Sequence, residues 1–174
     1  MTFLYIVFAI IALIIILGIL APKSYEVNRS IVVNKPLSEV FLYLKYIENQ
    51  NYWSPWKKKD PDMKQTYEGV DGEVGFISKW EGNKDVGTGE QEIKKIVENK
   101  RIDTELRFLK PWKSKSNGYI SIEETEDGNT KVIWGFTGNN PIPFNVFMLF
   151  FSFEKTVGKD FQEGLSNLKQ VLEQ

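Results

Sequence analysis

Residues 1–22 constrain this chain more than any other segment, because they contain a long run without a charged side chain. Residues 3–21 read FLYIVFAIIALIIILGILA. A helix of this length spans roughly 28 Å at 1.5 Å per residue, which is close to the hydrocarbon thickness of a bilayer. The run predicts a transmembrane helix. We therefore expect a membrane anchor over residues 1–22, followed by one folded domain over residues 23–174.

A cleaved signal peptide is the competing interpretation of this segment. Such a peptide carries a basic region, a shorter apolar stretch and a cleavage site formed by small residues. No lysine or arginine precedes the run, and Pro22 directly follows Ala21. These features favour an uncleaved anchor.

The flanking charges predict which side of the membrane holds the domain. Lys23, Arg29 and Lys35 follow the run, whereas no basic side chain precedes it. The positive-inside rule therefore predicts a single-pass membrane protein with its domain in the cytoplasm. The absence of cysteine agrees with a reducing compartment. Because 22 basic residues balance 23 acidic ones, and no basic stripe with interleaved aromatic residues occurs, we expect no nucleic-acid partner.

Hydrophobic periodicity predicts the elements of the domain. Residues 24–34 alternate as a strand, and residues 37–47 place apolar side chains at helical spacing. Further strands are predicted at residues 74–80, 86–97, 101–109, 116–124 and 131–137. From Phe147 onward, apolar residues recur every three or four positions, which predicts one helix of about 45 Å to the C-terminus. The predicted class is α+β, with a curved antiparallel sheet covered by this helix.

Two glycines interrupt the predicted C-terminal helix. Gly158 and Gly164 each cost about 1 kcal/mol relative to alanine in a helix interior. We interpret one or both as positions where the helix approaches the sheet closely. For Gly164, a tolerated surface glycine is an equal alternative.

Four motifs carry a resemblance to a known family: NYWSPWKKKDPDMKQTYEG, WEGNKDVGTGE, FLKPWKS and VGKDFQEGLSNLK. Together with the order of strand, short helix, sheet and long helix, they resemble the bacterial polyketide cyclase/dehydrase-like proteins of the START-like (SRPBCC) superfamily. The resemblance covers residues 24–174. It implies a helix-grip fold, in which about six to seven antiparallel strands wrap around the C-terminal helix and a cavity between them takes hydrophobic ligands. The family includes lipid carriers, cyclases and co-chaperone-like domains, so fold membership leaves the activity open.

The cavity that the resemblance implies has candidate lining residues among the aromatic and acidic positions. Trp53 and Trp56 stand three positions apart and have three interpretations: wall of a cavity, plain core, or a membrane contact made with Tyr52 and residues 57–59. The full set of candidates is Trp53, Trp56, Phe76, Trp80, Glu81, Glu90, Phe108, Trp112, Trp134 and Phe151.

The absence of histidine and cysteine limits the chemistry. It removes Ser-His-Asp triads, cysteine nucleophiles and His/Cys metal sites. We therefore expect no cofactor and no metal, and we assign no catalytic residue. Glu81 and Glu90 are the remaining acid candidates, because an apolar cavity raises the pKa of a carboxyl group. A solvated strand face is the competing interpretation for both.

The resulting hypothesis is a membrane-tethered, non-catalytic binding module for a hydrophobic small molecule or lipid. One alternative is a cyclase or dehydratase that uses a cavity carboxylate. The other is a co-chaperone-like domain that presents the WSPWKKK loop to a protein partner, whose identity is unknown. Residues 144–153 are apolar on nearly every side, which is more than one helix face needs. Either other parts of the protein cover this segment on two sides, or part of the segment contacts lipid.

Overall fold

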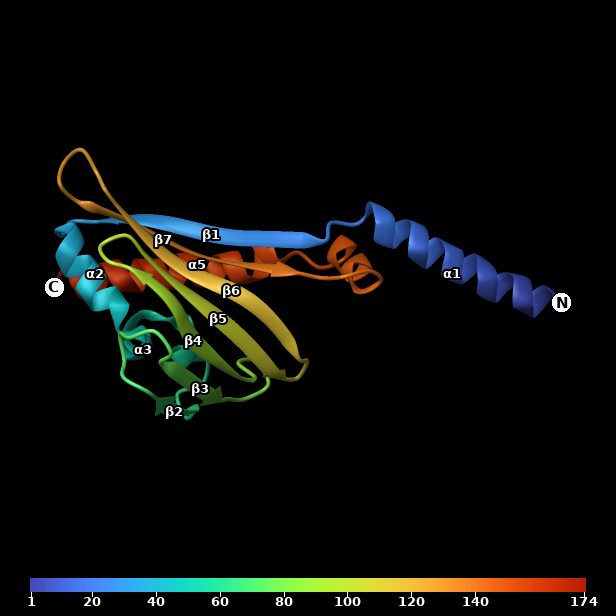
Figure 1. The fold of residues 1–174 in the computed structure, drawn as a ribbon, viewed down its shortest axis with the longest axis horizontal. Coiled ribbons are helices and arrows are strands. Elements are labelled where there is room, and N and C mark those ends of the chain that lie inside the picture. Colours follow the sequence, from blue (N-terminus) through green and yellow to red (C-terminus); the bar gives the residue numbers. More distant parts are fainter.

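The computed structural model describes residues 1–174 as a projecting apolar helix followed by a sheet-and-helix domain (Figure 1). Helix α1 (Thr2–Leu20) extends away from the domain. Seven strands form one antiparallel sheet in the order β1-β7-β6-β5-β4-β3-β2. The predicted α+β class, with a curved antiparallel sheet and a long C-terminal helix, is confirmed.

The helices of the domain lie between β1 and β2 and after β7, while β2 to β7 follow one another directly. The strands are β1 (Ser24–Val33), β2 (Lys64–Glu68), β3 (Ile77–Glu81), β4 (Thr88–Val97), β5 (Arg101–Lys110), β6 (Ser114–Glu124) and β7 (Thr130–Asn139). The helices of the domain are α2 (Leu37–Lys45), η1 (Ile47–Asn49), α3 (Gln50–Trp53), α4 (Pro55–Lys59), η2 (Phe144–Leu149) and α5 (Phe153–Leu172). Strand β2 lies at the sheet edge with mostly exposed side chains, so no alternation of apolar residues marks it in the sequence.

The strand register divides the sheet into an apolar inner face and a polar outer face. Val27 on β1 lies opposite Phe136 on β7, and both side chains are buried. Their chain neighbours Glu26 and Thr137 point to the other face, because successive side chains of a strand alternate. Helix α5 packs on the inner face along β1 (Figure 1).

The core fills the space between this inner face and the helices. Its largest fully buried side chains include Phe41 and Leu44 from α2, Trp53 from α3, and Leu165 and Leu168 from α5. Each such side chain contributes about 1.5–3 kcal/mol when removed from water. Helices α2, α3 and α5 are therefore held by burial against the sheet.

The C-terminal helix is shorter than the sequence pattern predicts. It begins at Phe153 and not at Phe147, and at 1.5 Å per residue its 20 residues span about 30 Å. Ser152 caps the helix, because its Oγ accepts a hydrogen bond from the backbone N–H of Lys155 at 3.3 Å. The preceding apolar residues instead form the separate 3₁₀ segment η2, which packs against α1.

Both glycines of α5 are buried at close contacts. A Cβ atom on Gly164 would lie 2.6 Å from Cζ3 of Trp134, and one on Gly158 would overlap the guanidinium of Arg29. The expectation of a close approach between helix and sheet is therefore confirmed. The alternative of a surface position for Gly164 is wrong, since the aromatic ring on β7 occupies the space of a side chain.

We predict that Gly164→Ala destabilises the full-length protein by about 1 kcal/mol. Overpacking against a buried indole costs about 1–3 kcal/mol, which outweighs the gain of about 1 kcal/mol in helix propensity. Thermal unfolding in detergent, followed by tryptophan fluorescence, measures the change. Gln162→Ala, at an exposed position of the same helix, serves as the control and stays within about 0.5 kcal/mol of the parent. A Gly164→Ala protein as stable as this control would contradict the close packing.

Candidate ligand site

Aromatic rings fill most of the space between α5 and the strands β1 and β7. The indole of Trp134 on β7 stacks on Phe161 of α5 with 4.2 Å between ring centroids. Trp53 meets the same indole edge-on at 4.7 Å, and Trp56 does so at 5.4 Å. This region is packed core, because the rings occupy each other's contact surfaces.

The packing continues toward α1 through a second pair of rings. Tyr25 at the start of β1 stacks on Phe153 at the start of α5, with centroids 4.1 Å apart and planes 11° from parallel. The Tyr25 hydroxyl group reaches across the inner face and shares a hydrogen bond of 3.1 Å with Ser116 on β6. This pair closes the end of the core that faces the apolar N-terminal helix.

An apolar hollow of about 200 Å³ lies beside this pair, between β1 and the segment that leads into α5. It is lined by Tyr25, Glu26, Val27, Met148, Phe151, Ser152, Phe153 and Glu154. An apolar protein cavity of about 150 Å³ accommodates benzene, whereas drug-sized ligands occupy about 300–1,000 Å³. The hollow therefore has room for one ring or a short piece of an acyl chain.

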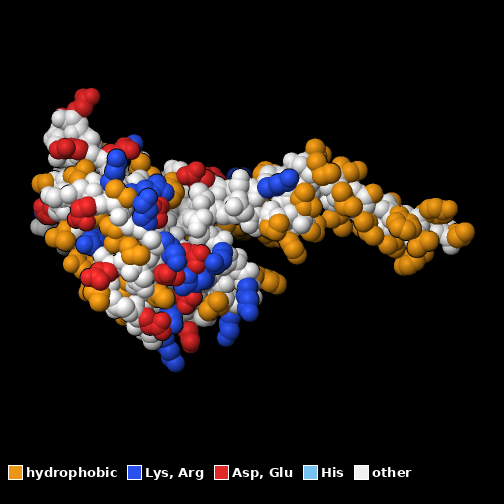
Figure 2. Space-filling model, viewed as in Figure 1, with side chains coloured by type: hydrophobic (Ala, Val, Ile, Leu, Met, Phe, Trp, Pro, Cys, Tyr) orange, Lys and Arg blue, Asp and Glu red, His pale blue; other side chains and the backbone are white.

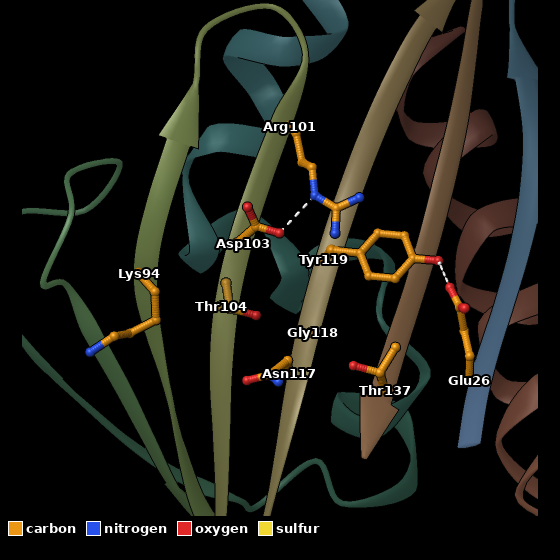
Figure 3. A pocket seen from close by; sticks show the side chains of 9 residues that line it. All are labelled: Glu26, Lys94, Arg101, Asp103, Thr104, Asn117, Gly118, Tyr119 and Thr137. Carbon is orange, nitrogen blue, oxygen red and sulfur yellow. Dashed lines mark hydrogen bonds and ion pairs between the residues drawn. The ribbon is translucent and has the colours of Figure 1, made fainter. Parts of the chain in front are cut away.

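A larger hollow of about 400 Å³ lies on the outer face of the sheet, turned away from the helices (Figure 3). Its charged groups are already paired: Tyr119 donates to Glu26 at 2.6 Å, Arg101 Nε donates to Asp103 at 2.7 Å, and Lys94 pairs with Glu92 at 2.9 Å. Burial and the hydrogen bond to Glu26 raise the pKa of Tyr119 to about 12, so the phenol stays protonated at neutral pH. We interpret this hollow as a solvated strand face and not as a site for an apolar ligand.

The aromatic candidates from the sequence do not share one cavity. Trp53, Trp56 and Trp134 meet in the core, whereas Phe76 is buried against Tyr67. Trp80 on β3 and Phe108 on β5 form a separate edge-on pair at 6.0 Å. Trp112 is 80% exposed in the turn between β5 and β6, and of all ten candidates only Phe151 lines the apolar hollow.

The lysines after Trp56 contact their own domain. Lys59 pairs with Asp160 of α5 at 2.7 Å, and Lys57 donates to the carbonyl oxygen of Met63 at 3.1 Å. Trp53 itself is 1% exposed. The structure therefore favours the core interpretation for Trp53, while Tyr52 beside it is 73% exposed.

The two acid candidates lie away from the apolar hollow. Glu81 is exposed at the end of β3. Glu90 points to the outer face, where Arg107 binds it together with Glu92 and Glu105. Hydrogen bonds from Lys115 and from Arg107 lower the pKa of Glu105 to about 2, because both donors favour the charged carboxylate. Of the two interpretations of these acids, the structure favours the solvated strand face.

The residues that shape the hollow beside Phe151 were missed by sequence analysis. Tyr25 belongs to the predicted strand of residues 24–34, and Phe153 belongs to the apolar run of residues 144–153. Neither pattern predicts that these two rings contact each other. Met148 lies in η2, which the pattern merged with the C-terminal helix. The residues that meet at this site are more than 120 positions apart in the sequence, whereas hydrophobic periodicity describes local structure only.

The sequence matches no protein-family model and no curated protein. Solved structures share the fold. The solution structure of the Aha1 dimer from Colwellia psychrerythraea has a TM-score of 0.60 at 16% identity and covers 86% of this chain and 96% of that chain. The crystal structure of Ara h 8.0201 has a TM-score of 0.57 at 14% identity and covers 86% and 98%, respectively. A protein from Rhizobium leguminosarum reaches 0.61 at 16% identity and covers 87% and 95%.

At these identities the likeness shows the fold alone, and it supports the helix-grip, START-like architecture. It carries no ligand and no activity to this chain, because one fold hosts many functions. The sequence resemblance and the structural neighbours therefore agree on the architecture of this α+β domain.

We predict that Arg107→Met destabilises the protein at pH 7 by about 1 kcal/mol, since three carboxylates lose their shared cation. In the parent, the lowered pKa of Glu105 stabilises the fold above pH 4.5, and this contribution is lost as the pH falls toward about 2. The variant lacks the part of this contribution that Arg107 supplies, while Lys115 keeps its own part, so the stability deficit of the variant should narrow as the pH falls from about 4.5 toward about 2. Unfolding temperatures across this range test the prediction. Lys131→Met, which removes one exposed cation near Glu123, is the control and should show no such trend.

Proposed function

We propose that this chain is a membrane-tethered module that binds an apolar small molecule or part of a lipid, without catalysing a reaction. The bound group occupies the hollow between β1 and residues 148–154. One observation carries the proposal: this apolar hollow lies at the end of the domain from which α1 departs. Its wall continues directly into η2, which packs on α1.

The contact between α1 and the domain supports a retained anchor over residues 1–22. By length and composition α1 can cross a membrane, with a mean hydropathy of 3.2, although a signal sequence meets the same criteria. A signal sequence is removed from its domain, so it needs no tertiary contact with it. Here Gly18 and Ala21 are buried against the segment around Asn145. We therefore assign residues 23–174 to a tethered domain, on the cytoplasmic side that Lys23 and its neighbouring cations favour.

The lining of the hollow favours binding over catalysis. Tyr25, Phe151, Phe153 and Met148 offer ring faces and a thioether, which make dispersion contacts with an apolar group. The two carboxylates at its rim are engaged elsewhere: Glu26 accepts the hydrogen bond from Tyr119, and Glu154 pairs with Arg29 at 2.6 Å. A cyclase or dehydratase needs a carboxyl group inside an apolar site, and the acids proposed for that role lie on the outer face or at a strand end.

The partner-binding alternative has weaker support. The WSPWKKK loop (residues 53–59) already uses Trp53 in the core and Lys59 in an ion pair with α5. One structural neighbour is described as a dimer, but at 16% identity it indicates only a shared fold. We therefore place the ligand in the hollow and assign no protein partner to this loop.

A photoreactive fatty acid tests the proposal. The full-length protein is reconstituted into vesicles that contain palmitic acid with a diazirine near its methyl end, and cross-linked peptides are mapped by mass spectrometry. We expect cross-links on Tyr25, since its partly buried ring lines the hollow beside Phe153. Met148→Trp adds volume to the hollow and should reduce cross-linking to β1 at least threefold.

Leu149→Trp is the matched control, because it adds the same ring at the neighbouring position, which does not line the hollow. Its cross-linking to β1 should equal that of the parent. Absence of any cross-link to β1 in the parent, or equal loss in both variants, would contradict ligand binding in this hollow.

A further inference from the structure

An exposed aromatic surface lies at the junction of α1 and the domain. Segment η2 and the residue after it leave three phenyl rings in solvent: Phe144 is 72% exposed, Phe147 63% and Phe150 81%. Leu149 and Ile142 extend this surface. Figure 2 shows hydrophobic side chains gathered along α1 and onto the adjoining end of the domain. A contiguous apolar surface of this kind marks an interaction site in a stable protein.

Asn145 fastens this segment to the end of α1. Its side chain is fully buried, and Nδ2 donates to the carbonyl oxygens of Gly18 at 2.7 Å and Ala21 at 3.1 Å. The last carbonyl groups of a helix lack partners within the helix, and an unpaired carbonyl is costly where water is scarce. The amide thus completes the C-terminal end of α1 and fixes η2 beside it.

Gly18 makes the contact between the two segments close. A Cβ atom at this position would lie 3.1 Å from Cγ2 of Ile142 and 3.5 Å from Oδ1 of Asn145. A larger side chain would push η2 away from α1. The end of α1 and η2 therefore form one packed unit, so the depth of η2 follows the depth of the helix end.

A second projection lies at the same end of the domain. The turn between β5 and β6 carries Trp112, which is 80% exposed, between the exposed side chains of Lys110 and Lys113. Figure 1 places this turn and η2 at the end of the domain that faces α1. Tryptophan and lysine are enriched where proteins meet the membrane–water interface, and lysine is attracted to anionic headgroups.

We propose that the exposed rings of η2 and the indole of Trp112 enter the interface of the bilayer that α1 crosses. The domain is then held at three points and does not swing on the short link between Ala21 and β1. This inference rests on the membrane tether of the proposed function, but it does not require a ligand in the hollow. With the domain docked in this way, the apolar hollow beside Phe151 lies close to the membrane surface, because its wall continues into η2.

Position and charge favour a bilayer over a second protein copy as the partner of this surface. The rings lie beside the last turn of a helix whose length matches the hydrocarbon core, so they sit at headgroup depth when that helix spans the membrane. Aromatic side chains are enriched at this depth. The lysines that flank Trp112 complement anionic lipid.

The chain contains no cysteine, so single cysteines allow clean placement of an environment-sensitive NBD fluorophore. Four full-length variants are compared: Phe147→Cys on η2, Trp112→Cys on the turn, Ile10→Cys in the middle of α1, and Asp127→Cys in the exposed turn between β6 and β7. Each labelled protein is reconstituted into phosphatidylcholine–phosphatidylglycerol vesicles, with or without bromine atoms on the acyl chains near the headgroups. Bromine quenches only a fluorophore that lies in the lipid.

We expect at least twofold quenching at Phe147 and Trp112, quenching at Ile10, and none at Asp127. Quenching at Ile10 without quenching at Phe147 would overturn the docking surface while the tether stands. Absence of quenching at all four positions would contradict the tether and the docking together. A blue-shifted but unquenched fluorophore at Phe147 would show that protein, such as a second copy, covers the rings, and this also overturns the inference.

The role of Asn145 is tested in the same vesicles. Asn145→Ala removes the hydrogen bonds to α1, and we expect quenching at Trp112 to fall at least twofold while quenching at Ile10 stays constant. Gly18→Leu disturbs the same contact from the helix side, leaves the domain sequence intact and should give the same result. Asn139→Ala, at an exposed position at the end of β7, is the matched control. Unchanged quenching at Trp112 in both Asn145→Ala and Gly18→Leu would contradict the coupling of the domain to α1.

Discussion

The structure depends on the packing of helix α5 across the inner face of β1 and β7. Trp134 stacks on Phe161 at 4.2 Å, and Gly164 provides the room that the indole requires. Because the first and the last strand of the chain are neighbours in the sheet, this contact joins both ends of the domain. The hollow exists only where this packing ends, at the start of α5, where Tyr25 and Phe153 close the core.

The same end of the domain carries the features on which the proposed membrane tether rests. Helix α5 begins at Phe153 because Ser152 caps its N-terminus. The apolar residues before this cap form the separate 3₁₀ segment η2. Segment η2 then meets α1 through Asn145. The apolar helix, the exposed rings and the hollow are therefore neighbours in space, as the proposed delivery of a ligand from the bilayer requires.

Charge is organised on the other face of the sheet. Arg107 binds Glu90, Glu92 and Glu105, and Arg101 lies over the ring of Tyr119 at 4.2 Å. These groups neutralise one another on a surface exposed to water, where ion pairs contribute modestly to stability. The strand register places Glu90 on this face beside Arg107, away from the apolar hollow.

The sequence by itself determined the apolar helix, the α+β class and most of the order of the elements, because periodicity and uncharged length are local properties. It did not show strand β2 or the separate segment η2, and it offered the close approach of the C-terminal helix as one interpretation of its glycines. It also indicated that residues 144–153 carry more apolar surface than one helix face needs. Only the tertiary structure decided where that surface goes, which acids face outward, and that Trp112 lies at an exposed turn while Phe151 lines the hollow. These outcomes depend on the pairing of β1 with β7 and on the contact of Asn145 with α1. Such pairings join residues far apart in the chain, and no local pattern encodes them.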